Sequence, residues 1–230
     1  MKTIGLIGGL SWESTAEYYR LLNRFAKEQT GGFSQAKCII FSVDLAEILE
    51  LQNKGDWERI GLILANAAKS LEAAGSDMIL LCTNTMHKVA KEIQSTITVP
   101  FLHIADETGK CLVDNHIKQV GFLGTIFTME QEFYIGRLRE KFGLEVFIPE
   151  QTDRRKISSI IYNELCMGTI NNESKNYYKE VMNKLVERGA QGIILGCTEI
   201  TLLVKQQDSP VPLFDTTFIH AKAAFKAAMD

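Results

Sequence analysis

The stretch Asp77-Met-Ile-Leu-Leu-Cys-Thr-Asn-Thr-Met-His87 decides the fold, because the chain contains a near copy of it, Gln191-Gly-Ile-Ile-Leu-Gly-Cys-Thr-Glu-Ile200. Each copy follows a helix-like run that ends in a glycine. Aligning these two glycines places Thr83 opposite Cys197, at the point where each apolar run stops. Short apolar runs that follow helices are typical of buried parallel strands. The repeat therefore predicts two similar halves, each with a small reactive side chain at the end of a strand.

The segments around these copies also recur. Ile4-Gly-Leu-Ile-Gly-Gly9 resembles Val120-Gly-Phe-Leu-Gly-Thr125, and Val99-Pro-Phe-Leu-His103 resembles Val211-Pro-Leu-Phe-Asp215. In both halves apolar strand-like runs alternate with helix-like runs. This alternation predicts an α/β fold in which parallel sheets are covered by helices on both faces.

We expect two pseudo-equivalent, doubly wound parallel-sheet domains that face a shared cleft. The first domain is predicted to contain residues 1–105 and 212–230, and the second to contain residues 106–211. Ligands of such sheets bind outside the carboxyl ends of the strands, where Thr83 and Cys197 are expected to lie.

Composition excludes several classes of function. The chain is 46% hydrophobic and 23% charged, with a net charge of −3 and no basic run, so neither nucleic acid nor an anionic membrane is an expected partner. No apolar run approaches the roughly 20 residues of a membrane span, and the first residues are too short for a signal peptide, which predicts a cytoplasmic protein. Five cysteines without C-x-x-C spacing indicate neither a disulfide framework nor a metal site.

The paired motifs resemble those of the aspartate/glutamate racemase family. The resemblance extends from Ile4-Gly-Leu-Ile-Gly-Gly9 through Thr83-Asn-Thr-Met-His87 to Gly196-Cys-Thr-Glu199 and Asp215, and so covers essentially the whole chain. It implies a racemase that inverts an α-amino acid with two protein groups and no cofactor such as pyridoxal phosphate. It also implies a homodimer.

The first motif departs from the family pattern, which has cysteine where this chain has Thr83. Cys82 lies one residue too early, and because side chains alternate across a strand, a shift of one residue aims it away from the cleft. The internal repeat supports the same alignment, since it pairs Cys197 with Thr83.

Racemisation requires a proton to leave one face of Cα and another to arrive at the opposite face. A thiolate suits proton removal, and the amides of residues 198–200 are expected to favour the Cys197 thiolate as a helix N-terminus would. A hydroxyl can donate a proton but is too weak an acid to act as an alkoxide base. In the family the second-half cysteine takes the proton of the L-enantiomer, which implies that Cys197 is the base, that Thr83 is the proton donor and that L-substrates are preferred.

The remaining candidates surround these two residues. Backbone amides and short polar side chains are expected to bind the substrate and stabilise the carbanion. The predicted substrate-binding residues are Leu10, Ser11, Gln52, Asn84, Thr85, Thr125, Thr128 and Thr198. His87 and Glu199 are predicted to support Thr83 and Cys197, with alternatives in which His87 satisfies a backbone carbonyl and Glu199 is an acid at a helix N-terminus.

The sequence allows more than one class of substrate. L-Aspartate and L-glutamate are the first expectation from the resemblance. Aspartate-specific members carry basic side chains where this chain has Glu47 and Cys166, so a broad-specificity racemase of neutral or basic amino acids is an alternative. Decarboxylation or double-bond isomerisation of small dicarboxylates is another. Loss of the first cysteine also allows an amino-acid-binding protein with a decayed site.

Overall fold

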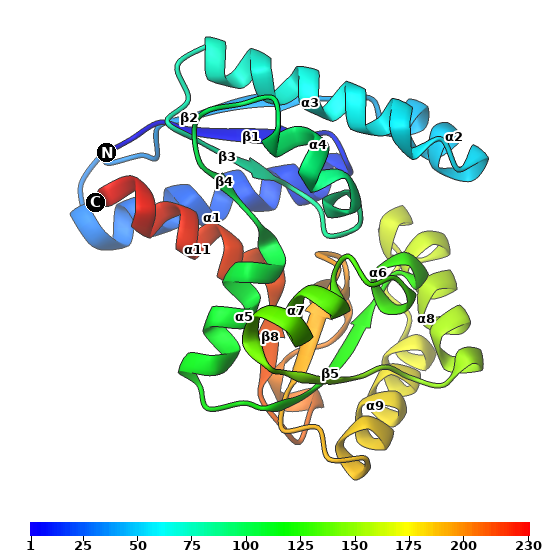
Figure 1. Cartoon of the computed structure of the whole chain (residues 1–230). Coiled ribbons are helices and arrows are strands. Elements are labelled where there is room, and N and C mark those ends of the chain that lie inside the picture. Colours follow the sequence, from blue (N-terminus) through cyan, green and yellow to red (C-terminus); the bar gives the residue numbers. More distant parts are fainter. The chain divides into compact units, whose positions relative to one another are not determined.

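The computed structural model describes residues 1–230, which form two compact units (Figure 1). The first comprises Met1–Ile104 and His220–Asp230, and the second comprises Ala105–Ile219. Each unit contains one four-stranded parallel sheet, with strand order β2-β1-β3-β4 in the first and β6-β5-β7-β8 in the second. The predicted α/β class is therefore confirmed, and the two sheets share one topology.

The first sheet is built from short strands joined by helical crossovers, with β1 and β3 buried and β2 and β4 partly exposed. Its strands are β1 (Ile4–Gly8), β2 (Cys38–Ser42), β3 (Met78–Leu81) and β4 (Phe101–Leu102). Its helices are α1 (Trp12–Thr30), α2 (Leu45–Lys54), α3 (Trp57–Ala73), the 3₁₀ turn η1 (Thr85–Val89) and α4 (Ala90–Gln94). The chain then enters α5 (Ile104–Asp114) and returns at its end through α11 (Thr216–Met229).

The second sheet repeats this order. Its strands are β5 (Gln119–Gly124), β6 (Glu145–Phe147), β7 (Ile193–Gly196) and β8 (Leu213–Asp215). Its helices are α6 (Ile126–Glu130), α7 (Ile135–Phe142), α8 (Gln151–Asn163), η2 (Leu165–Met167), α9 (Asn172–Glu187), α10 (Ile200–Leu203) and η3 (Gln206–Asp208).

The second crossing between the units lies later than the expected boundary at residue 212. β8 hydrogen-bonds to β7, with Ile193 opposite Leu213, so this strand is part of the second sheet. Only at His220, within α11, does the chain return to the first unit.

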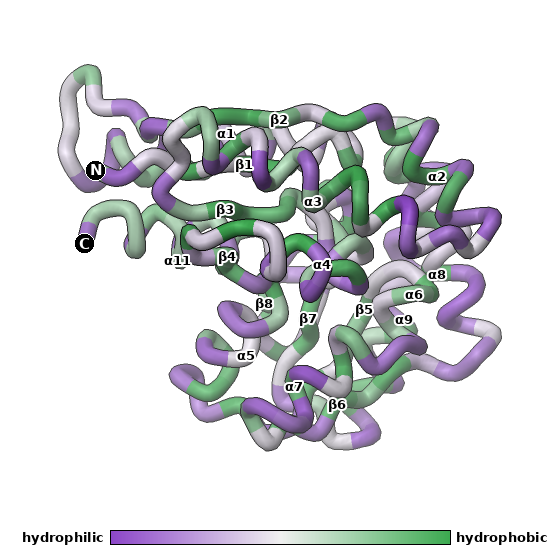
Figure 2. Tube along the Cα trace, turned by 45° about the horizontal axis from the view of Figure 1, so that its top comes forward, coloured by the Kyte–Doolittle hydropathy of each residue, from purple (hydrophilic) through white to green (hydrophobic).

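Strand periodicity determines how the first unit packs. Ile7, Ile79 and Leu81 belong to one apolar cluster with residues of α3 and α4. Tyr18 and Leu22 of α1 are also fully buried but lie outside that cluster. Figure 1 shows α1 and α11 on one face of this sheet and α3 on the other. Figure 2 shows β2 and β3 as hydrophobic stretches; β3 is buried, whereas the edge strand β2 is exposed at Ile40 and Phe41.

His220 attaches α11 to the first sheet. The Leu102 carbonyl accepts a hydrogen bond from His220 Nε2 at 2.9 Å, so the Tyr18 hydroxyl donates to the unprotonated Nδ1 at 2.8 Å. Burial lowers the pKa of His220 to about 4, against the weaker raising effect of the bond to Leu102. The imidazole is therefore neutral at pH 7. No helix of the protein has both the length and the hydropathy that a membrane span requires.

Candidate active site

Strand register shows that the two key motifs occupy equivalent positions, each within its own sheet. In the first sheet Gly5 lies opposite Ile79, and in the second Gly121 lies opposite Ile193. Thr83 and Cys197 are each four residues beyond these isoleucines, just past the ends of β3 and β7. The two side chains are therefore equivalent positions of two sheets with the same topology.

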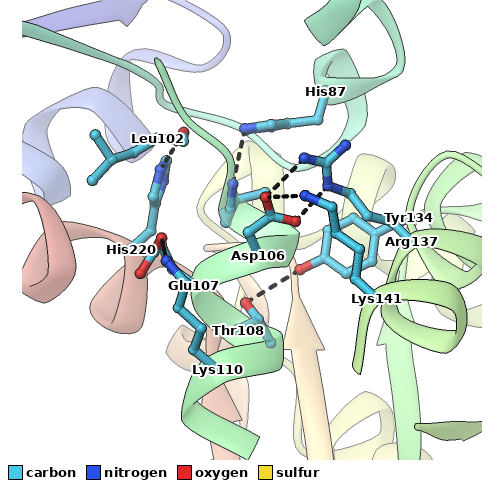
Figure 3. A network of polar contacts seen from close by, with 11 residues as sticks. His87, Leu102, Asp106, Glu107, Thr108, Lys110, Tyr134, Arg137, Lys141 and His220 are labelled. Atoms are coloured by element: carbon cyan, nitrogen blue, oxygen red, sulfur yellow. Dashed lines mark hydrogen bonds and ion pairs between the residues drawn. The ribbon is translucent and has the colours of Figure 1, made fainter. Parts of the chain in front are cut away.

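At the end of β3, His87 holds the backbone of Thr83. The backbone N–H of Ile104 donates to His87 Nε2 at 3.2 Å, which requires the proton to be on Nδ1 (Figure 3). That Nδ1–H donates to the Thr83 carbonyl at 2.7 Å. The His87 ring is buried and packs edge-on against His103 with 4.6 Å between ring centroids. His87 thus satisfies a backbone carbonyl, and that carbonyl belongs to Thr83.

The neighbouring candidates of the first unit are more deeply buried than Thr83. Thr83 is partly exposed, whereas Asn84 and Thr85 are buried at the start of η1. Cys82 is fully buried, its amide bonds to the Ile7 carbonyl, and burial raises the pKa of its thiol. The thiol next to Thr83 is therefore inaccessible from solvent.

The glycine turn after β1 leads directly into α1. Gly9 has a φ of 80°, and a Cβ at this position would lie 2.1 Å from the Val43 carbonyl oxygen, so only glycine fits. Leu10 and Ser11 are buried here, and the Ser11 hydroxyl caps α1 by accepting the Ser14 N–H at 3.2 Å. The Ser14 hydroxyl donates to the Cys82 carbonyl at 2.9 Å, which ties this turn to the end of β3.

Gln52 lies on α2, which is a regular helix. Asp44 caps its start and Gly55, in the left-handed conformation, ends it. The Gln52 side chain is buried, whereas Glu47 in the first turn is exposed.

At the end of β7, Cys197 is paired with a carboxylate. The Cys197 thiol donates a hydrogen bond to Glu199 Oε2 at 2.9 Å, and Glu199 is buried while Cys197 is partly exposed. Burial, the negative charge of Glu199 and this hydrogen bond raise the pKa of Cys197 well above its ordinary value. The backbone N–H of Glu199 lowers it, as the smallest of the contributions.

The expected effect of the amides is present but is the smaller one: the Glu199 N–H lowers the pKa of Cys197, while burial and the Glu199 carboxylate raise it by more. The following helix, α10, contains only four residues, Ile200–Leu203. Cys197 is a neutral thiol at pH 7.

Four threonines of the second unit form two pairs of neighbouring hydroxyls. Thr125 caps α6, and the Thr128 hydroxyl, which is fully buried, donates to the Thr125 carbonyl at 2.8 Å. Thr128 therefore orders the turn rather than facing solvent. The hydroxyls of Thr198 and Thr217 lie 2.9 Å apart, beside Cys197 in the chain.

Comparisons with known proteins agree with this arrangement. The model of the Asp/Glu/Hydantoin racemase family matches residues 7–224 of the chain. The chain belongs to this family. The protein is accordingly an amino-acid racemase, an isomerase independent of pyridoxal phosphate.

Two solved structures are similar to this chain over its whole length, and a curated relative is similar over most of it. A structure of a putative Asp/Glu racemase from Yersinia pestis is 54% identical, with all of both chains covered and a TM-score of 0.95. A structure of an aspartate racemase homologue from Pyrococcus horikoshii OT3 is 35% identical, again with full coverage, at a TM-score of 0.88. The broad specificity amino-acid racemase RacX of Bacillus subtilis (strain 168) is 27% identical over 171 residues, which are 73% of this racemase and 72% of RacX.

Tyr178, in the second unit, was not singled out from the sequence. Burial is the main cause of the raised pKa of the Tyr178 hydroxyl on α9, and Cys197, Glu164 and Cys166 contribute in the same direction. Cys166 lies on η2, which packs against α10 just beyond Cys197. Tyr178 lies on the buried face of α9.

The racemase has no group of three His, Cys, Asp or Glu side chains that could hold a metal ion. The polar groups at the strand ends are thiol, hydroxyl, amide and carboxylate, which can bind an amino acid and move protons.

Proposed function

We propose that the protein racemises L-aspartate or L-glutamate, with Cys197 removing the Cα proton and Thr83 returning a proton to the opposite face. The observation that carries this proposal is the equivalence of Thr83 and Cys197 at the ends of β3 and β7. Inversion at Cα needs two such groups, and the chain supplies one in each unit.

Glu199 is proposed to make Cys197 a base. In the hydrogen bond of 2.9 Å the thiol proton already points at Glu199 Oε2. Transfer of that proton leaves a thiolate and a carboxylic acid, and the positively charged ammonium group of an arriving amino acid favours the negative sulfur. The thiolate then takes the Cα proton and is a neutral thiol again, and Glu199 releases its proton to water, which balances the proton that Thr83 takes from water on the other side.

Thr83 is proposed as the donor on the other face. Its hydroxyl gives a proton to the carbanion and regains one from water, to which its partial exposure gives access. Because an alkoxide is a far less accessible base than a thiolate, proton removal from the D-enantiomer should be slower than removal from the L-enantiomer. His87 supports this role by holding the Thr83 carbonyl.

The remaining candidates are proposed to bind the α-carboxylate and the negative charge that develops next to it. Hydroxyl and amide donors suit this role, and loss of one such donor costs about 10²–10³ in rate in other enzymes. The proposed donors are Ser11, Asn84, Thr85, Thr125 and Thr198. We propose that Leu10 and Gln52 contact the rest of the substrate and that Thr128 acts through Thr125.

A second candidate is a broad-specificity racemase of neutral or basic amino acids. Glu47 and Cys166 stand where a cation would pair with an acidic side chain, and Glu47 is exposed in the first turn of α2. RacX, which covers 73% of this chain, is named for broad specificity. The homodimer is proposed from the family resemblance and is testable by analytical ultracentrifugation.

The deciding experiment measures exchange of the Cα proton in D₂O by NMR. L- and D-aspartate, L- and D-glutamate and a panel of neutral and basic amino acids are compared, with Cys197→Ala as control. Exchange of L-aspartate or L-glutamate that is lost in Cys197→Ala supports the first proposal, and exchange mainly of neutral or basic amino acids supports the second. Binding of an amino acid without exchange would refute both and favour a binding protein.

A further inference from the structure

The first turn of α11 lies against the segment that carries Cys197. The Thr216 hydroxyl donates to the Leu195 carbonyl in β7 at 2.9 Å. The hydroxyls of Thr217 and Thr198 lie 2.9 Å apart, and Thr198 directly follows Cys197 in the chain. Two contacts thus join the start of α11 to the end of β7, and the second of them reaches a proposed substrate-binding residue.

Thr217 is fixed in place before any substrate arrives. Its backbone N–H and that of Phe218 donate to Asp215 Oδ1 at 2.9 and 3.2 Å, which caps the helix. A threonine side chain in a helix has few accessible χ1 rotamers. The Thr217 side chain is also almost completely buried, at 1% exposure. The backbone cap, the stiff side chain and the burial together hold Thr217 Oγ1 at one position.

Burial decides the direction of the hydrogen bond between the two hydroxyls. Each hydroxyl has one proton to donate. Thr198 Oγ1 is the only hydrogen-bond partner of the Thr217 hydroxyl, so if Thr198 were the donor, the Thr217 proton would be buried without an acceptor. Thr198, in contrast, is partly exposed. Thr217 is therefore the donor, and the Thr198 proton points to an acceptor other than Thr217.

The shared fold of the two halves does not require a hydroxyl at position 217. Residues 99–103 and 211–215 are equivalent segments, so the counterpart of Thr217 is the residue two positions after His103. That residue is Ala105, which is fully buried in α5. One half thus begins its helix with a methyl group where the other half has a buried hydroxyl, and the Thr217 hydroxyl needs a reason beyond the fold.

We propose that Thr217 is a positioning residue, which donates to Thr198 Oγ1 and so turns the Thr198 hydroxyl proton towards the α-carboxylate of the substrate. This inference rests on the proposed role of Thr198 as a donor to the substrate. Because Thr217 occupies one acceptor position of Thr198 Oγ1, the Thr198 O–H bond loses less rotational freedom when a carboxylate binds. A hydroxyl that itself accepts a hydrogen bond is also a stronger donor to a charged acceptor. Every α-amino acid carries this carboxylate, so the effect should not depend on the substrate's side chain.

The test compares Thr217→Val, which replaces the hydroxyl by a methyl group, with Thr217→Ser, which keeps the hydroxyl. Both are made in the Cys197→Ala background, in which binding is measured without proton removal by the thiol. Calorimetry gives Kd for L-aspartate, L-glutamate, L-alanine and L-lysine. We expect Thr217→Val to raise the Kd of each amino acid that binds by about tenfold, and Thr217→Ser to stay within about twofold of the parent.

Thr108→Val is the matched control. Thr108 is fully buried in α5, and its hydroxyl lies 3.5 Å from the Tyr134 hydroxyl (Figure 3). The substitution removes a buried hydroxyl from a pair, as Thr217→Val does, but outside the proposed site. It should leave every Kd unchanged.

A double-mutant cycle separates positioning from a structural role. If Thr217 acts through Thr198, Thr217→Val should change Kd by less than about twofold in a protein that already carries Thr198→Val. In the active enzyme a merely structural residue lowers the folded fraction and with it the apparent kcat, but leaves KM unchanged. Thr217→Val should instead raise KM.

An unchanged Kd in a folded Thr217→Val variant, or an equal rise with and without the Thr198 hydroxyl, would overturn the proposal. Absence of binding by all four amino acids, both to the native protein and to Cys197→Ala, would overturn it as well. Binding that weakens as expected in a protein that exchanges no Cα proton would support the role of Thr217 and refute the proposed racemisation. The two failures are therefore distinguishable.

Discussion

The thiol of Cys197 donates a 2.9 Å hydrogen bond to the carboxylate of Glu199, two residues further along the segment that follows β7. Glu199 is buried, so its charge acts on the sulfur with little screening by water. The pair holds one proton between a weak acid and a carboxylate, and in the resting state that proton is on sulfur. In the proposed mechanism the arriving substrate shifts this proton to Glu199.

Replacing Glu199 by Gln tests this electrostatic link. The negative charge of Glu199 and its hydrogen bond both raise the pKa of Cys197, second only to burial, so the variant should form its thiolate at a lower pH. The absorbance of the thiolate near 240 nm, titrated against a Cys197→Ala reference, measures this shift. Glu132→Gln, at an exposed position, serves as control, and an unchanged or higher thiol pKa in Glu199→Gln would contradict the account.

His87 is expected to contribute to stability through both ring nitrogens. In His87→Phe the Ile104 N–H loses its 3.2 Å bond to Nε2, and the Thr83 carbonyl loses its 2.7 Å bond to Nδ1. Buried groups that lose a partner destabilise by about 1–3 kcal/mol, so the free energy of unfolding should fall by about 2 kcal/mol in urea titrations. His116→Asn, at an exposed position with a φ of 60°, should change it by less than about 0.5 kcal/mol. Equal stability of the two variants would refute this prediction.

Much of the fold could be predicted because the same order of sequence segments occurs twice in the chain. Apolar runs of four to six residues separated by helix-like segments indicate parallel strands, and the repeat of Gly75 and Gly189, both with positive φ in the structure, aligns β3 with β7. The alignment of Thr83 with Cys197 follows from that register. The later return at His220 was missed although the repeat carries a signal for it: residues 211–215 resemble residues 99–103, and β8 pairs with β7 as β4 pairs with β3.

The electrostatics of the site were less predictable than its position. From sequence, Cys197 precedes a helix-like segment, which suggests a lowered thiol pKa, but the result depends on where the Glu199 side chain points. The same holds for Tyr178, since helical spacing shows that it is buried but not whether its hydroxyl has a partner. Rotamers and desolvation, not residue spacing, decide these properties.

Acidification should destabilise the first unit through His220. The pKa of His220 is about 4 in the folded protein and 6.5 in its ordinary state, so between these values the unfolded chain binds more protons than the folded one. Stability is therefore complete above about pH 6.5 and is lost progressively towards pH 4, by about 3 kcal/mol in total. Urea titrations across this range measure the loss.

His220→Gln is the matched variant for this pH dependence. Gln can donate to the Leu102 carbonyl and accept from the Tyr18 hydroxyl, but it does not titrate. The difference in unfolding free energy between native protein and variant should therefore shift with pH between 6.5 and 4 in favour of the variant. A difference that is constant over this range would exclude His220 as the cause.

Thr83→Cys should make the two directions of proton exchange more nearly equal. A thiol at this position can form a thiolate, with an ordinary pKa of about 8.5, whereas the threonine hydroxyl cannot act as a base near neutral pH. We expect exchange of the D-substrate Cα proton in D₂O to rise by about tenfold or more, while exchange of the L-substrate changes less. Cys82→Ala is the control, because Cys82 is fully buried and should leave the D-to-L ratio of exchange rates unaltered. If Thr83→Cys leaves this ratio unchanged, or if Cys82→Ala alters it as strongly, the proton-transfer group of the first unit is not the side chain at position 83.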